Sequence, residues 1–182
     1  MTISINMLDK SGIDYDWRTL YVGISVNLIE CNELTIYALK IMENNEYNDD
    51  EFINELAWGI DDNLKGELLT KMLLKFNLDM LIPQSASWEL EIRKLRYAIL
   101  NYLNSTIDDV NELLKKVEEV YADFNYPQEM EEFIAYMPVR DNVATNSIED
   151  NIKRMINSLD NFIIEEKKEL DAIDEMIEFN RE

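Results

Sequence analysis

Apolar side chains recur at steps of three and four residues along most of the chain, and this spacing predicts a series of helices. The first begins at Asp16, a good N-cap residue, and places Trp17, Leu20, Tyr21, Ile24 and Leu28 on one face. Further helices are expected to begin near Asn32, Asn48 or Asp49, Asp61, Ser85 or Ser87, Thr106, Pro127 and Ser147. Gly23 interrupts the first helix, where it indicates either a weak point or close packing against a neighbour.

The last predicted helix covers residues 147–182 and carries a heptad-like stripe. Its apolar positions are Ile156, Leu159, Ile163, Leu170, Ile173 and Ile177, and Glu166 interrupts them. A long helix packed across the rest of the fold explains this pattern, and a seam for self-association is the alternative. The short run and the glutamate favour the packed helix.

Few glycines and prolines punctuate the sequence, only four and three, so a strand-rich fold lacks its turn signals. We therefore predict an all-α fold, an irregular bundle or short solenoid-like stack of about seven to eight helices. The length of 182 residues is typical of one domain, so residues 1–182 are expected to form a single helical domain. Residues 1–15 lack a helical period and are expected to form an arm or an edge strand.

Charge is the strongest feature of the composition: thirty-eight acidic residues against seventeen lysines and arginines give a formal net charge of −21. Such a surface repels phosphate backbones and anionic lipid heads and attracts cationic partners, so we expect no nucleic-acid or membrane partner. The same charge also serves simple solubility. We find no secretory signal pattern and no apolar run of membrane-spanning length, so a cytoplasmic location is expected.

Most catalytic and metal-binding arrangements lack their residues in this sequence. Histidine is absent, Cys31 is the only cysteine, and the four glycines never cluster. Histidine-based catalysis, a zinc site, a disulfide within the chain and a glycine-rich phosphate loop are therefore not expected. We predict a protein that is not an enzyme and that holds no metal or cofactor.

Carboxylates alone could still hold magnesium, as they do in helical nucleotide pyrophosphohydrolases. The candidate acid pairs are Glu129 with Glu132, Glu119 with Asp123, and Glu175 with Glu178. With so many acids such spacings arise by chance, and solvated helix faces are the more ordinary explanation. A magnesium-dependent hydrolase and an acidic mimic of nucleic acid remain the alternatives to a protein-binding role.

Two segments combine acids with aromatic residues, a combination suited to binding a basic protein. Residues 41–64 hold eight acids and no lysine or arginine, and residues 108–133 hold nine acids and two lysines. Phe52 and Trp58 are expected in the core, whereas Tyr47 and Tyr126 fit either the core or the surface. The candidate partner-binding residues are Glu43, Glu46, Tyr47, Asp49, Asp50, Glu51, Glu55, Asp61, Asp62, Asp123, Tyr126, Glu129 and Glu132.

Several stretches of the chain resemble a bacterial family, domain of unknown function 2247. They are DWRTLYVG at 16–23, ELAW at 55–58 with the following DDNLKGELL, RKLRYAILNYL at 93–103, and VEEVYADFNYPQEMEEFIAYMP at 117–138. YADFNYP followed by FIAYMP is the most specific part, and the segment after Asn142 adds nothing to the resemblance.

This resemblance brings no catalytic residues with it. Small acidic families of this kind often accompany polymorphic secreted toxins as their immunity proteins, so the resemblance implies a cognate toxin domain as the partner. A basic, nuclease-like toxin cleft is one that an acidic helical domain could occlude.

Overall fold

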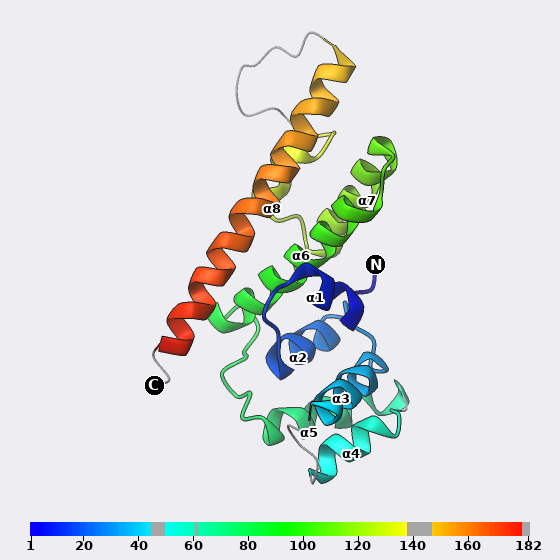
Figure 1. The fold of residues 1–182 in the computed structure, drawn as a ribbon, viewed down its shortest axis with the longest axis vertical. Coiled ribbons are helices and arrows are strands. Elements are labelled where there is room, and N and C mark those ends of the chain that lie inside the picture. Colours follow the sequence, from blue (N-terminus) through cyan, green and yellow to red (C-terminus); the bar gives the residue numbers. More distant parts are fainter. Residues whose placement is uncertain (45–49, 61, 138–146, 180–182) are drawn as a thin grey trace. The chain divides into compact units, whose positions relative to one another are not determined.

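Every regular element is a helix in the residues that the computed structural model describes, which are 1–44, 50–60, 62–137 and 147–179 (Figure 1). The α-helices and the two 3-10 helices, named η, are α1 (Ile5–Ser11), α2 (Trp17–Ser25), α3 (Glu33–Glu43), α4 (Glu51–Ala57), η1 (Asp62–Leu64), α5 (Lys65–Lys75), α6 (Ala86–Thr106), α7 (Val110–Asp123), η2 (Gln128–Phe133) and α8 (Ile148–Phe179). The predicted all-α class, the approximate number of helices and the long C-terminal helix are confirmed.

The chain divides into two compact units. The N-terminal unit comprises residues 2–95, and the C-terminal unit comprises Met1 and residues 96–182. Helix α6 begins in the first and continues into the second. Behaviour as one domain stays a prediction.

An aromatic cluster forms the centre of the N-terminal unit. Trp17 of α2 stacks on Phe76, the residue after α5, with ring centroids 4.4 Å apart and an interplanar angle of 8°. Tyr37 of α3 meets the Trp17 ring edge-on at 4.7 Å. Offset stacking and edge-to-face contacts are the favoured arrangements of aromatic pairs, so this cluster ties α2, α3 and α5 together.

The first residues form a helix, so the prediction of an arm or edge strand was wrong. The Ser4 side chain caps α1 by accepting a hydrogen bond from the Met7 amide at 3.3 Å, and Gly12 ends it with a φ of 65°. Ile5 and Leu8 are buried. Seven residues make only two turns, which is too short for a helical period to show in the sequence.

The predicted start of α2 and the predicted close packing at Gly23 are both confirmed. The Asp16 carboxylate accepts a hydrogen bond from the Arg18 amide at 2.8 Å, and Asp16 with Thr19 forms a capping box. A Cβ atom added at Gly23 would lie 2.5 Å from Cδ1 of Ile29. After α2 the chain folds back so that the Ile29 side chain packs against Gly23, and glycine leaves the room that this contact needs.

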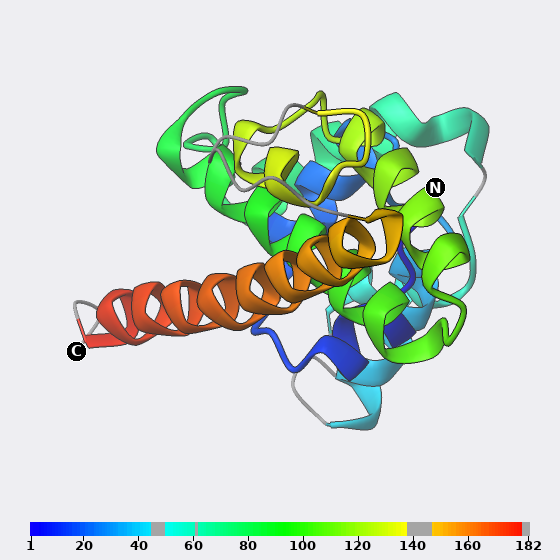
Figure 2. The ribbon, with the colours of Figure 1, turned by 90° about the horizontal axis from the view of Figure 1, so that it is seen from above.

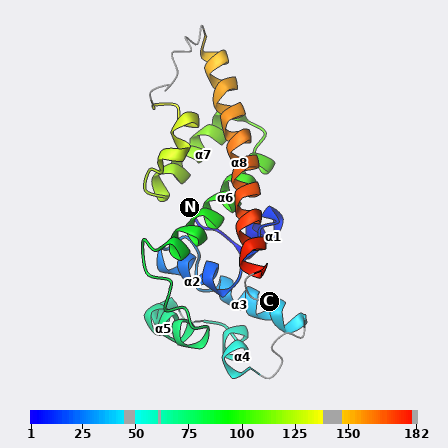
Figure 3. The same cartoon turned by 90° about the vertical axis from the view of Figure 1, so that its left-hand side faces the viewer.

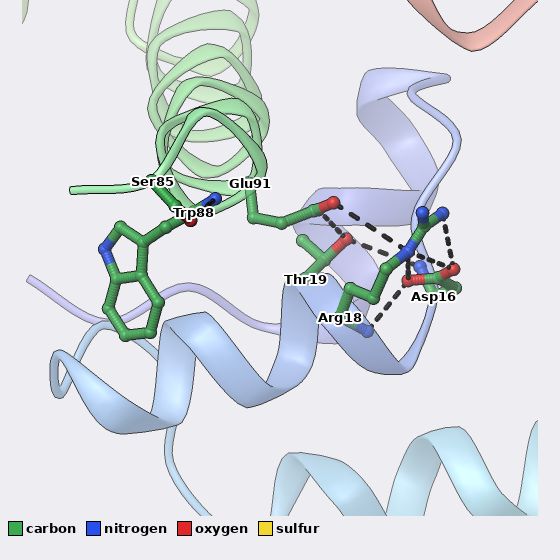
Figure 4. Close-up of polar contacts among 6 residues, drawn as sticks. All are labelled: Asp16, Arg18, Thr19, Ser85, Trp88 and Glu91. Atoms are coloured by element: carbon green, nitrogen blue, oxygen red, sulfur yellow. Dashed lines mark hydrogen bonds and ion pairs between the residues drawn. The ribbon is translucent and has the colours of Figure 1, made fainter. Parts of the chain in front are cut away.

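A buried polar network joins α2 to the start of α6 (Figure 4). The Thr19 hydroxyl donates to Oε2 of Glu91 at 2.7 Å, and Nε of Arg18 lies 4.0 Å from Oε1. Glu91 is only 1% exposed, and burial raises the pKa of its carboxyl despite the opposing charge of Lys94. Ser85 caps the same helix by accepting from the Trp88 amide at 3.2 Å, as predicted.

In the C-terminal unit, α8 runs without a break from Ile148 to Phe179 and packs against η2 (Figures 1 and 2). Ser147 begins it, as predicted, by accepting from the Asp150 amide at 3.1 Å. Its buried positions are Met155, Leu159, Ile163, Glu166 and Leu170. Ile156 and Ile173 are half-buried, the side chain of Ile177 lies outside the described residues, and self-association stays a prediction.

Glu166 does not interrupt the buried stripe but belongs to it. Its carboxylate lies 3.5 Å from Nη2 of Arg96, and both side chains are buried. The Arg96 guanidinium also lies 5.6 Å from the centre of the Phe162 ring. The charged residue in the apolar heptad pattern is thus accommodated by an internal ion pair with Arg96.

Three predicted helix starts need correction. Asp109, not Thr106, caps α7 by accepting from the Glu112 amide at 2.8 Å, while the Thr106 hydroxyl donates to the Tyr102 carbonyl inside α6. Helix α4 is capped by Asp50 rather than Asn48 or Asp49. A 3-10 turn, η1, precedes α5, which therefore begins four residues after Asp61. Neighbouring capping residues compete for such ends, so sequence locates them only approximately.

None of the helices described here is long and apolar enough to cross a membrane.

Candidate partner-binding surface

The first acidic segment is only partly described. Four candidate residues of this segment lie outside the described residues, namely Glu46, Tyr47, Asp49 and Asp61. The side chain of Asp62 also lies outside the description. Glu43 is exposed at the end of α3, and Glu51 and Glu55 are exposed on α4.

Helix α5 lies beside α4 (Figures 1 and 3), and two of its lysines neutralise part of this segment. Nζ of Lys75 lies 2.5 Å from Asp50, and Nζ of Lys71 lies 2.7 Å from Glu55 and 3.7 Å from Glu67. The Lys75 ammonium holds the pKa of the Asp50 carboxyl below its ordinary value. Asp50 also caps α4, so its role here is structural.

Trp58 is 91% exposed, so the prediction that it belongs to the core was wrong. Helix α4 buries Ile53 and Leu56. Trp58 follows Leu56 by two residues, a rotation of about 200° around a helix, so its side chain leaves on the opposite side. Phe52 is only half-buried, with its ring centroid 5.9 Å from that of Phe76, so it lies at the edge of the core in which it was predicted.

A small recess lies between α4 and α5. It has a volume of about 80 Å³ and an apolar lining of Leu56, Ile60, Leu64 and Leu68. Glu55, Glu67 and Lys71 also line it. This part of the surface therefore offers apolar area with compensated charge rather than a concentration of negative charge.

The second acidic segment is described throughout. The Asp123 carboxylate contacts the Met1 amino group at 2.6 Å. Glu129 is exposed and lies 4.0 Å from Nη1 of Arg96, and Glu132 is exposed while its backbone carbonyl accepts from Arg154 at 2.9 Å. Lys116 is paired with Glu119 at 2.8 Å, so one of the segment's two lysines is already engaged.

Tyr126 lies at a Schellman motif that ends α7. The Tyr126 amide donates to the Tyr121 carbonyl at 2.8 Å and the Asn125 amide donates to the Ala122 carbonyl at 3.0 Å, the two bonds that define this motif. Asn125 and Tyr126 both have left-handed backbones, with φ of 61° and 59°. The Tyr126 ring is 58% exposed and contacts buried Tyr121 edge-on at 5.3 Å. The question left open by the sequence is answered: Tyr126 lies at the surface.

Tyr136 is a surface aromatic that the sequence did not single out. It is 61% exposed, and its ring centroid lies 6.4 Å from that of Tyr121. It belongs to a turn closed by the Met137 amide and the Ile134 carbonyl at 3.1 Å. Phe133 and Ile134 precede Tyr136, and both are buried. The only signal in the sequence that this short segment packs closely was this pair of adjacent apolar residues.

Among the described side chains, no three cysteine, aspartate or glutamate residues converge as they would around a metal ion. Glu119 and Asp123 engage Lys116 and the Met1 amino group, while Glu129 faces Arg96. The side chain of Glu178 lies outside the description.

Not predicted from the sequence were the buried charged residues Glu91, Lys94, Arg96 and Glu166. Helical spacing does not distinguish a buried polar position from an exposed one.

Comparison with known proteins matches residues 5–167 to the model of a family described as uncharacterized protein conserved in bacteria, domain of unknown function 2247. The match is wider than the resemblance in the sequence indicated, because it continues past Asn142 into α8. Searches among curated proteins and among solved structures found no match. The chain therefore belongs to the bacterial family domain of unknown function 2247.

Proposed function

We propose that this protein is an acidic, immunity-type binding protein that neutralises a basic, nuclease-like bacterial toxin domain by occluding its active site. The resemblance of the chain to a small acidic bacterial family supports a toxin domain as the partner. The arrangement of charge and aromatic residues supports a partner that is basic.

The observation that carries the proposal is that each acidic segment leaves an aromatic ring in water. Trp58 follows α4 and Tyr126 follows α7, at 91% and 58% exposure. Aromatic side chains of this size bury about 150–250 Å² each in an interface. At about 25 cal/mol per Å², burial of the exposed part of one such side chain contributes about 2–6 kcal/mol before the costs of association.

The negative charge should increase the rate of association with a basic partner and select against acidic competitors, in addition to the contribution of these aromatic anchors. With a formal net charge of −21, the protein attracts a basic domain over long distances and repels acidic competitors. Within the N-terminal unit, Lys71 and Lys75 compensate part of the charge beside Trp58. The segment 108–133 holds nine acids against two lysines, and the Met1 amino group and Arg96 compensate part of its charge in the same way.

The test is complex formation with the product of the adjacent gene. The two purified proteins are mixed, and a complex is sought by size exclusion and titration calorimetry at about 50 mM and about 300 mM salt. We expect a one-to-one complex that weakens with salt, and growth protection when both genes are expressed. Absence of a complex with every basic neighbour, or a complex that leaves the toxic activity intact, contradicts the proposal.

A further inference from the structure

The exposed rings Tyr126 and Tyr136 flank the buried ring of Tyr121 in the C-terminal unit. Ring faces carry negative electrostatic potential, and surfaces that combine several of them bind cations. Two exposed rings that both contact Tyr121 therefore have the composition of a cation-binding surface.

Two acidic residues belong to the same elements as these rings. Glu118 precedes Tyr121 by three residues on α7, so the two side chains share one face of that helix. Glu131 belongs to η2, which lies between Tyr126 and Tyr136 in the chain. Desolvation raises the pKa of the Tyr136 hydroxyl, and Glu118 and Tyr126 add to this effect. Desolvation also raises the pKa of the Tyr121 hydroxyl, and Glu131 adds to it. A cation placed there gains from both the rings and the acids.

The backbone holds Tyr126 in place before any partner arrives. Its amide is bonded within the Schellman motif, and Pro127, with a φ of −65°, follows as the N-cap of η2. A left-handed backbone is unfavourable for a tyrosine, and here the hydrogen bonds of the Asn125 and Tyr126 amides maintain it. Because the ring is preorganised, binding loses little conformational entropy.

We propose that Tyr126 and Tyr136, with Glu118 and Glu131, form a docking surface for an arginine side chain of a basic protein partner. A guanidinium is planar and weakly hydrated, so it stacks on tyrosine rings while it donates to carboxylates, which a lysine ammonium does less well. The charge of the surface excludes phosphate and anionic lipid as occupants. The inference rests on the proposed function and names the chemical group that this part of the surface receives.

The first measurement uses a hexa-arginine peptide and the unaltered full chain. Amide and tyrosine-ring NMR shifts are followed during titration, with an uncharged hexa-citrulline peptide of the same shape as the control. We expect the arginine-induced shifts to concentrate at Tyr121, Tyr126 and Tyr136. Shifts spread evenly over acidic helix faces, or equal shifts with the uncharged peptide, overturn the proposal.

The second measurement compares variants by their affinity for the same peptide. The double variant Y126A/Y136A is expected to weaken binding about 5–20-fold, because each exposed cation–aromatic contact contributes about 2–5-fold. Y126F/Y136F keeps the rings and should bind within about twofold of the parent. L74A, which removes an exposed apolar side chain of the N-terminal unit, should leave the affinity unchanged. Unchanged binding by Y126A/Y136A overturns the proposal.

The complex with the adjacent gene product separates this inference from the proposed function. If hexa-arginine binds at the tyrosines but no toxin complex forms, the docking surface stands and the proposed function fails. If the toxin complex forms and tolerates Y126A/Y136A, the proposed function stands and the docking surface is overturned.

Discussion

The Arg96 guanidinium and the Glu166 carboxylate face each other inside the C-terminal unit, with Nη2 and Oε1 3.5 Å apart and side-chain exposures of 6% and 7%. They join α6 to the middle of α8. A pair this buried loses its hydration, so its net contribution to stability is small, but each member depends strongly on the other.

Removing one partner should therefore be costly. We expect Glu166→Ala to lower the free energy of unfolding by about 3–5 kcal/mol, because only the exposed carboxylate of Glu129, 4.0 Å away, then compensates the buried Arg96 charge. Glu165→Ala, at the neighbouring exposed position, should change it by less than about 0.5 kcal/mol. The measurement is urea unfolding followed by circular dichroism. The apolar double variant R96M/E166L should recover most of the loss, and equal effects of the two single variants would contradict this account.

Two glycines in helices should respond to alanine in opposite directions. At Gly23 the added methyl would lie 2.5 Å and 2.7 Å from Cδ1 and Cγ1 of Ile29, so Gly23→Ala should destabilise by about 1–3 kcal/mol. At Gly66 nothing lies within 4 Å, so Gly66→Ala should stabilise by about 0.5–1 kcal/mol through helix propensity. Thermal melts report both signs, and I29A should relieve the G23A penalty. Stabilisation by G23A would show that the contact with Ile29 yields easily.

Glu91 should make stability depend on pH in a direction that is unusual for a carboxylate. Burial raises its pKa in the folded protein, and Asp16 adds to this, while Lys94, Thr19 and Arg18 oppose it. The folded state therefore binds the proton more readily than the unfolded state, so this group contributes increasing stability as the pH falls through its folded pKa, and the gain is complete below about pH 4.3.

Subtraction of Glu91→Gln isolates this contribution from the other acids. We expect the stability of the parent relative to E91Q to rise as the pH is lowered from about 8 to about 4, measured by urea unfolding at each pH. A difference that stays constant or falls with decreasing pH would show that Lys94, Thr19 and Arg18 outweigh burial.

Asn125 should distinguish glycine from alanine. Its φ of 61° is a conformation that glycine adopts freely and alanine does not. We expect Asn125→Gly to stabilise by a few tenths of a kcal/mol and Asn125→Ala to destabilise by about 1 kcal/mol. Chemical unfolding of both variants provides the measurement. Equal stability of the two would mean that α7 does not end in the Schellman motif.

Trp58 should act in binding rather than in folding. Trp58→Ala should weaken the proposed toxin complex by about 2 kcal/mol or more, the usual loss for a tryptophan hot spot, and leave the melting temperature unchanged. Leu74→Ala removes another exposed apolar side chain, 72% exposed on α5, and serves as the matched control. Calorimetric titration of both variants decides the point. Parent-like affinity of W58A removes Trp58 from the interface.

Helix positions could be predicted wherever the apolar spacing ran for about three turns or more, as in α3, α6 and α8, and in the shorter α2 the Asp16 cap marked the start. Helix α1 was not predicted because it has only two turns. The predicted starts of α4 and α7 differ from the observed caps Asp50 and Asp109, because several capping residues lie close together there. Local hydrogen bonding fixes such ends, and neighbouring polar residues satisfy it almost equally well.

The candidate surface was harder to predict, since exposure depends on which residues the fold brings together. Residues 41–64 contain no lysine or arginine, yet α5 brings Lys71 and Lys75 against them. Trp58 looked like a core residue because it is large and apolar, but it follows buried Leu56 by two residues and so leaves α4 on the opposite side. Conversely, Glu166 was interpreted as an interruption of the apolar stripe because it is charged, whereas it is buried beside Arg96 of α6.

The division of the chain into two units has a spectroscopic consequence. All three tryptophans, Trp17, Trp58 and Trp88, belong to the N-terminal unit. The aromatic residues of the C-terminal unit are all tyrosine or phenylalanine. Tryptophan emission excited at the red edge thus reports one half of the molecule. Trp17 and Trp88 are buried and Trp58 is almost fully hydrated, so W58F would leave only blue-shifted emission in the folded state. Comparison of that signal with far-ultraviolet circular dichroism would show directly whether the two halves unfold together.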